Sequence, residues 1–169
     1  MIIRPEEGRD RIGSIEVEAA AFGEPAEARI VEAIRDEPGS FALVAEVDGG
    51  IVGHVQMSTA WVGEDEVLAL GPIGVLPSHQ GRGIGTALVA AALDASERRG
   101  APAVILLGSP AYYGARGFVP AVRFGLRNPF AGVMPDGSQI EEEDFQIAVL
   151  KPAQVDLLTG DTRWHAAFG

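Results

Sequence analysis

The segment Gln80-Gly81-Arg82-Gly83-Ile84-Gly85-Thr86 is the most informative stretch of this chain. It follows an apolar, strand-like segment, residues 67–75, and runs into residues 87–93, whose composition favours helix. Glycines at a strand-to-helix junction allow positive φ and a close approach of the backbone to a ligand, because no Cβ stands in the way. The exposed N–H groups of such a turn, with the partial positive charge of the helix N-terminus, predict an anion site whose natural occupant is phosphate.

Two common phosphate-binding motifs fit this segment poorly. A P-loop ends in Gly-Lys-Ser/Thr, and the only lysine of the chain is Lys151. A dinucleotide fingerprint has glycines at its first, third and sixth positions, whereas Thr86 is the sixth residue counted from Gly81 and the preceding strand contains Gly71-Pro72. A glycine-rich helix start with a structural role only is the remaining alternative.

Composition and charge limit the function classes. The 169 residues, 47% apolar and 22% charged, predict one globular domain spanning residues 1–169. The chain has no cysteine, and its three histidines are scattered, so we expect no disulfide and no metal site. A net charge of −11 argues against nucleic-acid binding. We find no signal peptide and no apolar run of membrane-spanning length, which predicts a cytoplasmic protein.

The chain reads as a mixture of strands and helices with a hairpin near its middle. Residues 48–50, Asp-Gly-Gly, predict a tight turn between two strands, which starts an antiparallel sheet. A polar connection is expected at residues 61–66, and a charge run, residues 141–144, reads as a solvated face. Strands are expected at residues 2–4, 41–47, 51–58, 67–75, 103–107, 119–126 and 145–150, and helices at residues 10–22, 26–36 and 85–99.

The dipeptide Gly71-Pro72 interrupts the strand before the glycine segment. Proline cannot donate to a strand ladder and glycine has no side chain to pack, so the pair indicates a bulge, or a place where the strand separates from its neighbour. Backbone groups freed in this way could pair with the amides of an extended ligand, as an added strand would. A bulge that only shapes the sheet is the alternative.

Two motifs resemble those of the GNAT N-acetyltransferase family. Gln80, Gly83 and Gly85 match its acyl-CoA pyrophosphate loop, Gln/Arg-x-x-Gly-x-Gly/Ala. Tyr113-x-x-x-Gly117-Phe118 matches its Tyr-x-x-x-Gly-Phe signature, and the preceding Gly-Ser-Pro-Ala-Tyr-Tyr is similar to its YhbS-like branch in particular. The motifs stand in family order, with a helix and a strand between them.

The resemblance implies an α/β fold of the GNAT type. In that fold a mixed, mostly antiparallel sheet is splayed at its bulged fourth strand and has helices on both faces. It further implies that acetyl-CoA, as acetyl donor, is held by Ile73, Gly74, Val75, Gln80, Gly81, Arg82, Gly83, Ile84, Gly85, Thr86 and Tyr113.

Tyr113 is the candidate general acid, because a phenol can protonate a departing thiolate and the family commonly uses the matching tyrosine in this way. Tyr112 is the second candidate, and a half-buried aromatic without a chemical role is the alternative for both.

No motif position identifies the general base. Candidates are Glu27 and Glu32 from the second helix and His54 and Gln56 from a central strand. The alternative for the two glutamates is a solvated charge on the helix surface. The alternative for His54 is a side chain that faces solvent, or a core histidine whose hydrogen bonds are satisfied.

The resulting hypothesis is an acetyl-CoA-dependent N-acetyltransferase that acts on a primary amine of a small molecule, peptide or protein by direct transfer in a ternary complex. It requires no metal, and GNAT domains often form homodimers. A non-catalytic acyl-CoA-binding regulatory module is the alternative from another class. A Rossmann-like nucleotide binder would need a parallel sheet, which the hairpin at residues 48–50 disfavours.

Overall fold

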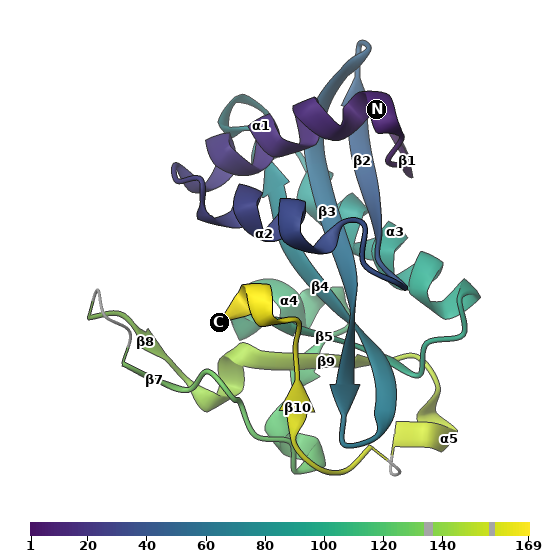
Figure 1. Ribbon diagram of the computed structural model, residues 1–169, viewed down its shortest axis with the longest axis vertical. Helices are drawn as coiled ribbons and strands as arrows, with labels where there is room; N and C mark the ends of the chain where they lie inside the picture. The colour runs from purple at the N-terminus through teal and green to yellow at the C-terminus, as the bar shows by residue number, and fades with distance from the viewer. Residues whose placement is uncertain (134–136, 156–157) are drawn as a thin grey trace. The chain divides into compact units, whose positions relative to one another are not determined.

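The computed structural model describes residues 1–133, 137–155 and 158–169 (Figure 1). Within it the chain forms two compact units. The first comprises residues 1–59, 70–95 and 165–169, and the second comprises residues 60–69 and 96–164. Two long strands, β3 (Gly50–Val62) and β4 (Asp65–Val75), contribute to both units. The single domain expected over residues 1–169 stays a prediction.

The sheet of the first unit has the order β1-β2-β3-β4. Pairing of β1 with β2 and of β2 with β3 is antiparallel, with Ile3 opposite Ala45 and Phe41 opposite Met57. Asp48 and Gly49 have φ values of 51° and 80°, the two positive values that a two-residue type I′ hairpin turn requires. The remaining elements of this unit are β1 (Ile2–Pro5), β2 (Phe41–Val47), α1 (Arg11–Phe22), α2 (Ala26–Ile34) and most of α3 (Ile84–Arg98).

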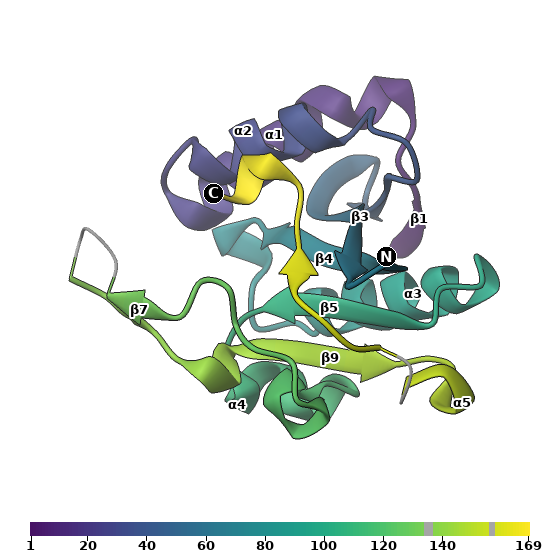
Figure 2. The same cartoon turned by 60° about the horizontal axis from the view of Figure 1, so that its bottom comes forward.

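Helices lie on both faces of this sheet, as Figure 2 shows for α1 and α2 on one side and α3 on the other. A Cβ added to Gly53 on β3 would come within 3.0 Å of Leu88 of α3. On the other face, a Cβ added to Gly74 on β4 would come within 2.8 Å of Glu18 and 3.1 Å of Ala21 of α1. Glycine at these two positions therefore lets a helix approach each face closely.

The sheet of the second unit has the order β4-β5-β9-β6, and β10 pairs with β3. The pairing of β4 with β5 is parallel, which makes β4, α3 and β5 the expected βαβ crossover, while β9 runs antiparallel to β5 and β6. The elements are β5 (Ala103–Leu107), α4 (Pro110–Tyr113), β6 (Val119–Pro120), β7 (Gly132–Val133), β8 (Gln139–Ile140), β9 (Phe145–Val149), α5 (Pro152–Val155) and β10 (Thr162–Arg163).

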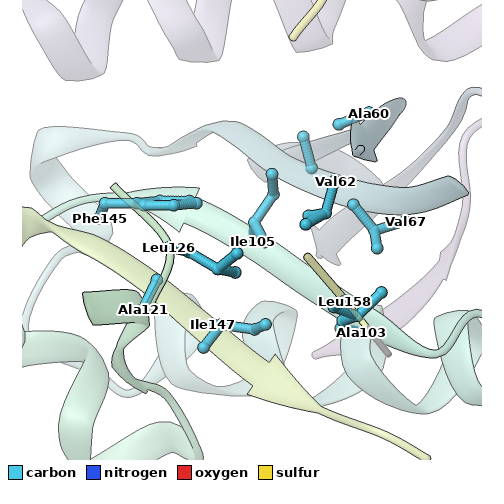
Figure 3. Close-up of a cluster of buried hydrophobic side chains, with 11 residues drawn as sticks. Ala60, Val62, Val67, Ala103, Ile105, Ala121, Leu126, Phe145, Ile147 and Leu158 are labelled. Atoms are coloured by element: carbon cyan, nitrogen blue, oxygen red, sulfur yellow. The ribbon is translucent and has the colours of Figure 1, made fainter. Parts of the chain in front are cut away.

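The core of the second unit lies on one side of these strands (Figure 3). Ile105 and Ile147 face each other across β5 and β9 with no solvent exposure, and the Phe145 ring is fully buried beside them. Trp164 packs edge-on against Phe145, with ring centroids 6.0 Å apart. The buried set that forms this core is Ala60, Val62, Val67, Ala69, Ala103, Ile105, Ala121, Leu126, Phe145, Ile147 and Leu158.

Two local predictions were wrong, and a third was incomplete. Residues 61–66 are not a polar connection, because β3 continues to Val62 and β4 begins at Asp65, each burying side chains in the core just described. The strand expected at residues 119–126 ends at Pro120 and is followed by a 3-10 helix, Ala121–Phe124. The charge run at residues 141–144 is more than a solvated face: Glu142 Oε1 accepts a hydrogen bond of 2.7 Å from the backbone N–H of Asn128.

Candidate active site

The glycine segment forms an open turn at the N-terminus of α3. Gly81 and Gly83 adopt left-handed conformations, with φ of 73° and 79°, and a Cβ at either position would meet nothing within 4 Å. Both are exposed, as is Arg82 between them. The helix then begins with a hydrogen bond of 3.0 Å from the Ala87 N–H to the Gly83 carbonyl. A helix start preceded by exposed left-handed glycines has the geometry that an anion such as a phosphate needs.

The turn is anchored on the strands beneath it. The Gln80 side chain donates a hydrogen bond of 3.0 Å from Nε2 to the Val75 carbonyl at the end of β4. Leu76, the next residue, donates its N–H to the Val52 carbonyl of β3 at 2.9 Å. The glutamine of the motif therefore has a structural role: it closes the turn onto the strand that precedes it.

Strand β4 is paired with β5 only before the Gly71-Pro72 step. The registered pairs are Leu68 with Val104 and Ala69 with Ile105. The expected separation of this strand from its neighbour near Gly71 therefore agrees with the register. Beyond it, Ile73 and Val75 are half-buried, and Gly74 is buried against α1.

A buried pair of titratable side chains, one glutamate and one histidine, lies directly against Gly74. Glu18 of α1 and His54 of β3 both have fully buried side chains, and Glu18 Oε1 lies 2.6 Å from His54 Nδ1. Burial raises the pKa of the Glu18 carboxyl, because desolvation penalises its charged form, while the hydrogen bond with His54 acts in the opposite direction. This pair was not predicted from the sequence, although Glu18 stands in the buried stripe of α1 with Ser14 and Val17, where a charged residue is unexpected.

Further polar groups surround this pair. His54 Nε2 lies 3.9 Å from Glu6 Oε1, which is also 2.5 Å from the Ser14 hydroxyl and 3.8 Å from the Arg35 guanidinium. Glu27 of α2 raises the pKa of Glu18 further through its negative charge. Within residues 1–133, 137–155 and 158–169, the buried atoms Glu18 Oε2, Glu27 Oε2 and His54 Nε2 have no side-chain hydrogen-bond partner.

The structure separates the predicted base candidates by environment. His54 is fully buried, and Glu27 is half-buried with one carboxylate oxygen closed off from solvent. Glu32 is exposed on α2. Gln56 is buried, but its amide donates to the carbonyls of Phe41 and Met57 at 3.2 and 3.0 Å, which is a structural role.

In the second unit, Tyr113 ends the short helix α4 and is half-buried. Its ring packs edge-on against Tyr112 and Phe118, with centroid distances of 4.8 and 5.7 Å. Gly117, with φ of 91°, turns the chain back so that the Phe118 N–H bonds to the Tyr113 carbonyl at 3.3 Å. A Cβ at Gly108 would overlap the Tyr113 ring. The Tyr-x-x-x-Gly-Phe signature is thus a local packing unit that orients the tyrosine.

The described residues hold neither a metal-binding cluster nor a membrane-spanning helix. No group of three or more histidine, aspartate or glutamate side chains in residues 1–133, 137–155 and 158–169 could hold a metal ion. In the same ranges no helix combines the length and apolar character needed to cross a membrane.

The mixed α/β fold and the glycine turn before α3 are together typical of the acetyl-CoA-dependent acyltransferases of the GNAT type. Residues 10–119 match the model of the Acetyltransferase (GNAT) family, and the chain belongs to this family. The N-acetyltransferase YhbS of Escherichia coli K12, described as uncharacterized, is 31% identical over 99% of this chain and 98% of its own length. The crystal structure of E. coli YhbS in complex with CoA has a TM-score of 0.88 at 30% identity and covers 99% of this chain and 91% of that one.

A second solved relative is a GNAT family acetyltransferase from Brucella melitensis in complex with acetyl-CoA. It has a TM-score of 0.77 at 31% identity, and the match covers 99% of this chain and 97% of that chain. The expected α/β fold with a mostly antiparallel sheet is therefore confirmed.

Proposed function

We propose that this protein is an acetyl-CoA-dependent N-acetyltransferase that transfers an acetyl group directly to a primary amine in a ternary complex. The observation that carries the proposal is the turn at Gly81 and Gly83, where two left-handed glycines leave open space before the N-terminus of α3. Relatives that match 99% of the chain were crystallised with CoA and with acetyl-CoA. Direct transfer uses the proximity of two bound reactants and needs no covalent enzyme intermediate.

In this proposal the turn and the end of β4 hold the donor. The pyrophosphate binds the backbone N–H groups of residues 80–86, and the pantetheine amides pair with residues 73–75 as an added strand would. A backbone N–H near Val75 polarises the thioester carbonyl and stabilises the oxyanion of the tetrahedral adduct. The end of the β4 and β5 register at Ala69 supports this arrangement, because the registered pairs with β5 stop before residues 73–75.

Tyr113 has the proposed role of general acid. Its phenol protonates the CoA thiolate, or donates a hydrogen bond to it, as the carbon–sulfur bond breaks. The edge-on contacts of its ring with Tyr112 and Phe118 support the role, since they restrict the orientation of the hydroxyl.

A thermal-shift titration tests the proposal, since a ligand that binds only the native state raises the melting temperature with concentration. We expect a shift with acetyl-CoA and CoA and none with NAD or ATP. The same samples, mixed with a panel of primary amines, should release free CoA thiol. Stabilisation by acetyl-CoA without thiol release would favour the regulatory module instead, and no stabilisation by either CoA species would overturn the proposal. A homodimer and a cytoplasmic location stay predictions.

A further inference from the structure

Three side chains, two fully buried and one half-buried, lead from the end of β4 to the surface of the first unit. Glu18 Oε2 lies next to Gly74, in the strand proposed to hold the thioester. Glu18 Oε1 is 2.6 Å from His54 Nδ1, and His54 Nε2 is 3.9 Å from Glu6 Oε1. The exposed fraction of the side chain is 0% for Glu18 and His54 and 10% for Glu6. Only the last of the three therefore touches solvent.

We propose that Glu18, His54 and Glu6 form a proton relay that accepts the proton of the acceptor's ammonium group and delivers it to solvent. The inference rests on the proposed function and names the proton acceptor that the sequence did not identify. An imidazole suits the middle position, because one ring nitrogen takes up a proton while the other releases one. Each end of this imidazole faces a carboxylate.

The end of the relay that receives the proton has two buried carboxylate oxygens, from Glu18 and Glu27. Among the residues that the structure describes, Glu18 Oε2 and Glu27 Oε2 are buried carboxylate oxygens without a side-chain hydrogen-bond partner, and the Gly74 backbone lies beside Glu18 and stabilises its charged form. Two such oxygens favour a cation, which fits an acceptor amine that arrives protonated. The proton reaches Glu18 Oε2 from this ammonium through one bridging water, since the carboxylate itself has no exposed surface.

The proton balance of the reaction is complete. The ammonium loses one proton to Glu18, and the resulting amine forms a carbon–nitrogen bond to the thioester carbonyl. The carbon–sulfur bond then breaks, the nitrogen loses its second proton, and the thiolate takes up one proton. One proton per turnover is thus released to solvent. It passes from His54 to Glu6 through a bridging water, because the 3.9 Å between His54 Nε2 and Glu6 Oε1 is too long for a direct hydrogen bond.

The charged groups around the relay make Glu18 a suitable acceptor. Burial and the negative charge of Glu27 raise its pKa, whereas His54 and the Gly74 backbone lower it. Arg35, 3.8 Å from Glu6 Oε1, and the Ser14 hydroxyl stabilise charge at the outer end. A carboxyl with a raised pKa removes a proton from an ammonium more effectively near neutral pH than one with an ordinary pKa.

The test uses three variants of the relay: the isosteric Glu18→Gln and Glu6→Gln, and His54→Gln. The control variant is Glu16→Gln, because Glu16 is an exposed residue of α1, the helix that carries Glu18. Release of CoA thiol from acetyl-CoA is followed against pH, with n-butylamine and benzylamine as acceptors. We expect Glu18→Gln to lower kcat/KM for the amine at least about 100-fold at neutral pH. The loss should shrink as pH rises toward the pKa of the amine, because a free amine needs no proton acceptor. Glu16→Gln should match the wild type throughout.

Two further measurements distinguish a loss of the relay from a loss of CoA binding or of folding. Calorimetric CoA affinity should be equal in Glu18→Gln and wild type, and circular dichroism should show equal folding. A rate loss of the same size at every pH, or an unchanged rate, would overturn the relay while the acetyltransferase assignment stands. Failure of the wild type to bind CoA or to acetylate either amine would overturn the proposed function and the relay with it.

Discussion

Gly74 and Glu18 lie so close that any larger residue at position 74 would force neighbouring atoms to shift. A Cβ there would come within 2.8 Å of Glu18 Oε2 and 3.1 Å of the Ala21 Cβ. The carboxylate cannot move aside freely, because it is fully buried and held by His54. The strand proposed to bind the acyl group is therefore shaped by a charged side chain of α1.

Gly74→Ala should destabilise the fold by about 1–3 kcal/mol, because the added methyl group overpacks this contact. Urea unfolding measures the loss. Gly8→Ala is the matched control, since a Cβ at Gly8 meets nothing within 4 Å and its φ is not in the left-handed region. In a Glu18→Ala background the cost of Gly74→Ala should fall. Equal costs in both backgrounds would show that the carboxylate is not the cause.

Gly83→Asp should abolish CoA binding, since it places bulk and negative charge where the phosphate is proposed to bind. It also introduces backbone strain of about 1 kcal/mol at a positive φ. Gly125→Asp controls for that strain, because Gly125 has φ of 75° and equally open surroundings. Calorimetric titration with CoA compares the two variants. Similar affinity in both would refute the assignment of the turn, and Gly85→Asp should repeat the loss.

Tyr113→Phe should leave acetyl-CoA affinity nearly unchanged, because the ring contacts with Tyr112 and Phe118 do not need the hydroxyl. Turnover should fall at least about 100-fold if the phenol protonates the thiolate. Steady-state kinetics with a primary amine separate kcat from KM. Tyr112→Phe is the control, since that ring is exposed beneath Arg116. Loss of affinity and turnover together would indicate a packing role instead.

Asp10→Asn should destabilise the protein by about 2 kcal/mol at neutral pH, because it breaks a charged pair with Arg4 in which Asp10 is buried. Arg4 lies 2.6 Å from Asp10 Oδ2, and its hydrogen bond lowers the pKa of this carboxyl from 3.8 to about 2. A lowered pKa in the folded state contributes stability that is present above pH 3.8 and is lost as pH falls toward 2.

The difference between Asp10→Asn and wild type should therefore shrink as the pH of a urea-unfolding series falls from 5 toward 2. Asp36→Asn provides the comparison, because the ion pair of Asp36 with Arg11 is exposed and should contribute little. A difference that does not change with pH would mean that the Asp10 charge is not the source of the stability.

Features that depend on neighbouring residues were predicted correctly from the sequence. The hairpin at Asp48 and Gly49, the turn at Gly81 and Gly83, and the start of β5 after Gly100 all follow from backbone preferences within a few residues. The boundaries that were wrong depended on tertiary packing. Val62 extends β3 because it is buried in the core of the second unit, and no local pattern distinguished it from a connection.

In the candidate site, too, some features follow from the local sequence and others from tertiary packing. The sequence alone determined the family motifs and the left-handed glycines, since positive φ without a side chain is a property of single residues. Only the tertiary structure decided that Glu18 meets His54, 36 residues further along the chain, and that both are fully buried. Helix and strand patterns show which residues share a face but not which faces meet. The raised pKa of Glu18 arises from the burial of its carboxylate between packed elements, because desolvation depends on everything packed around it, whereas His54 lowers this pKa.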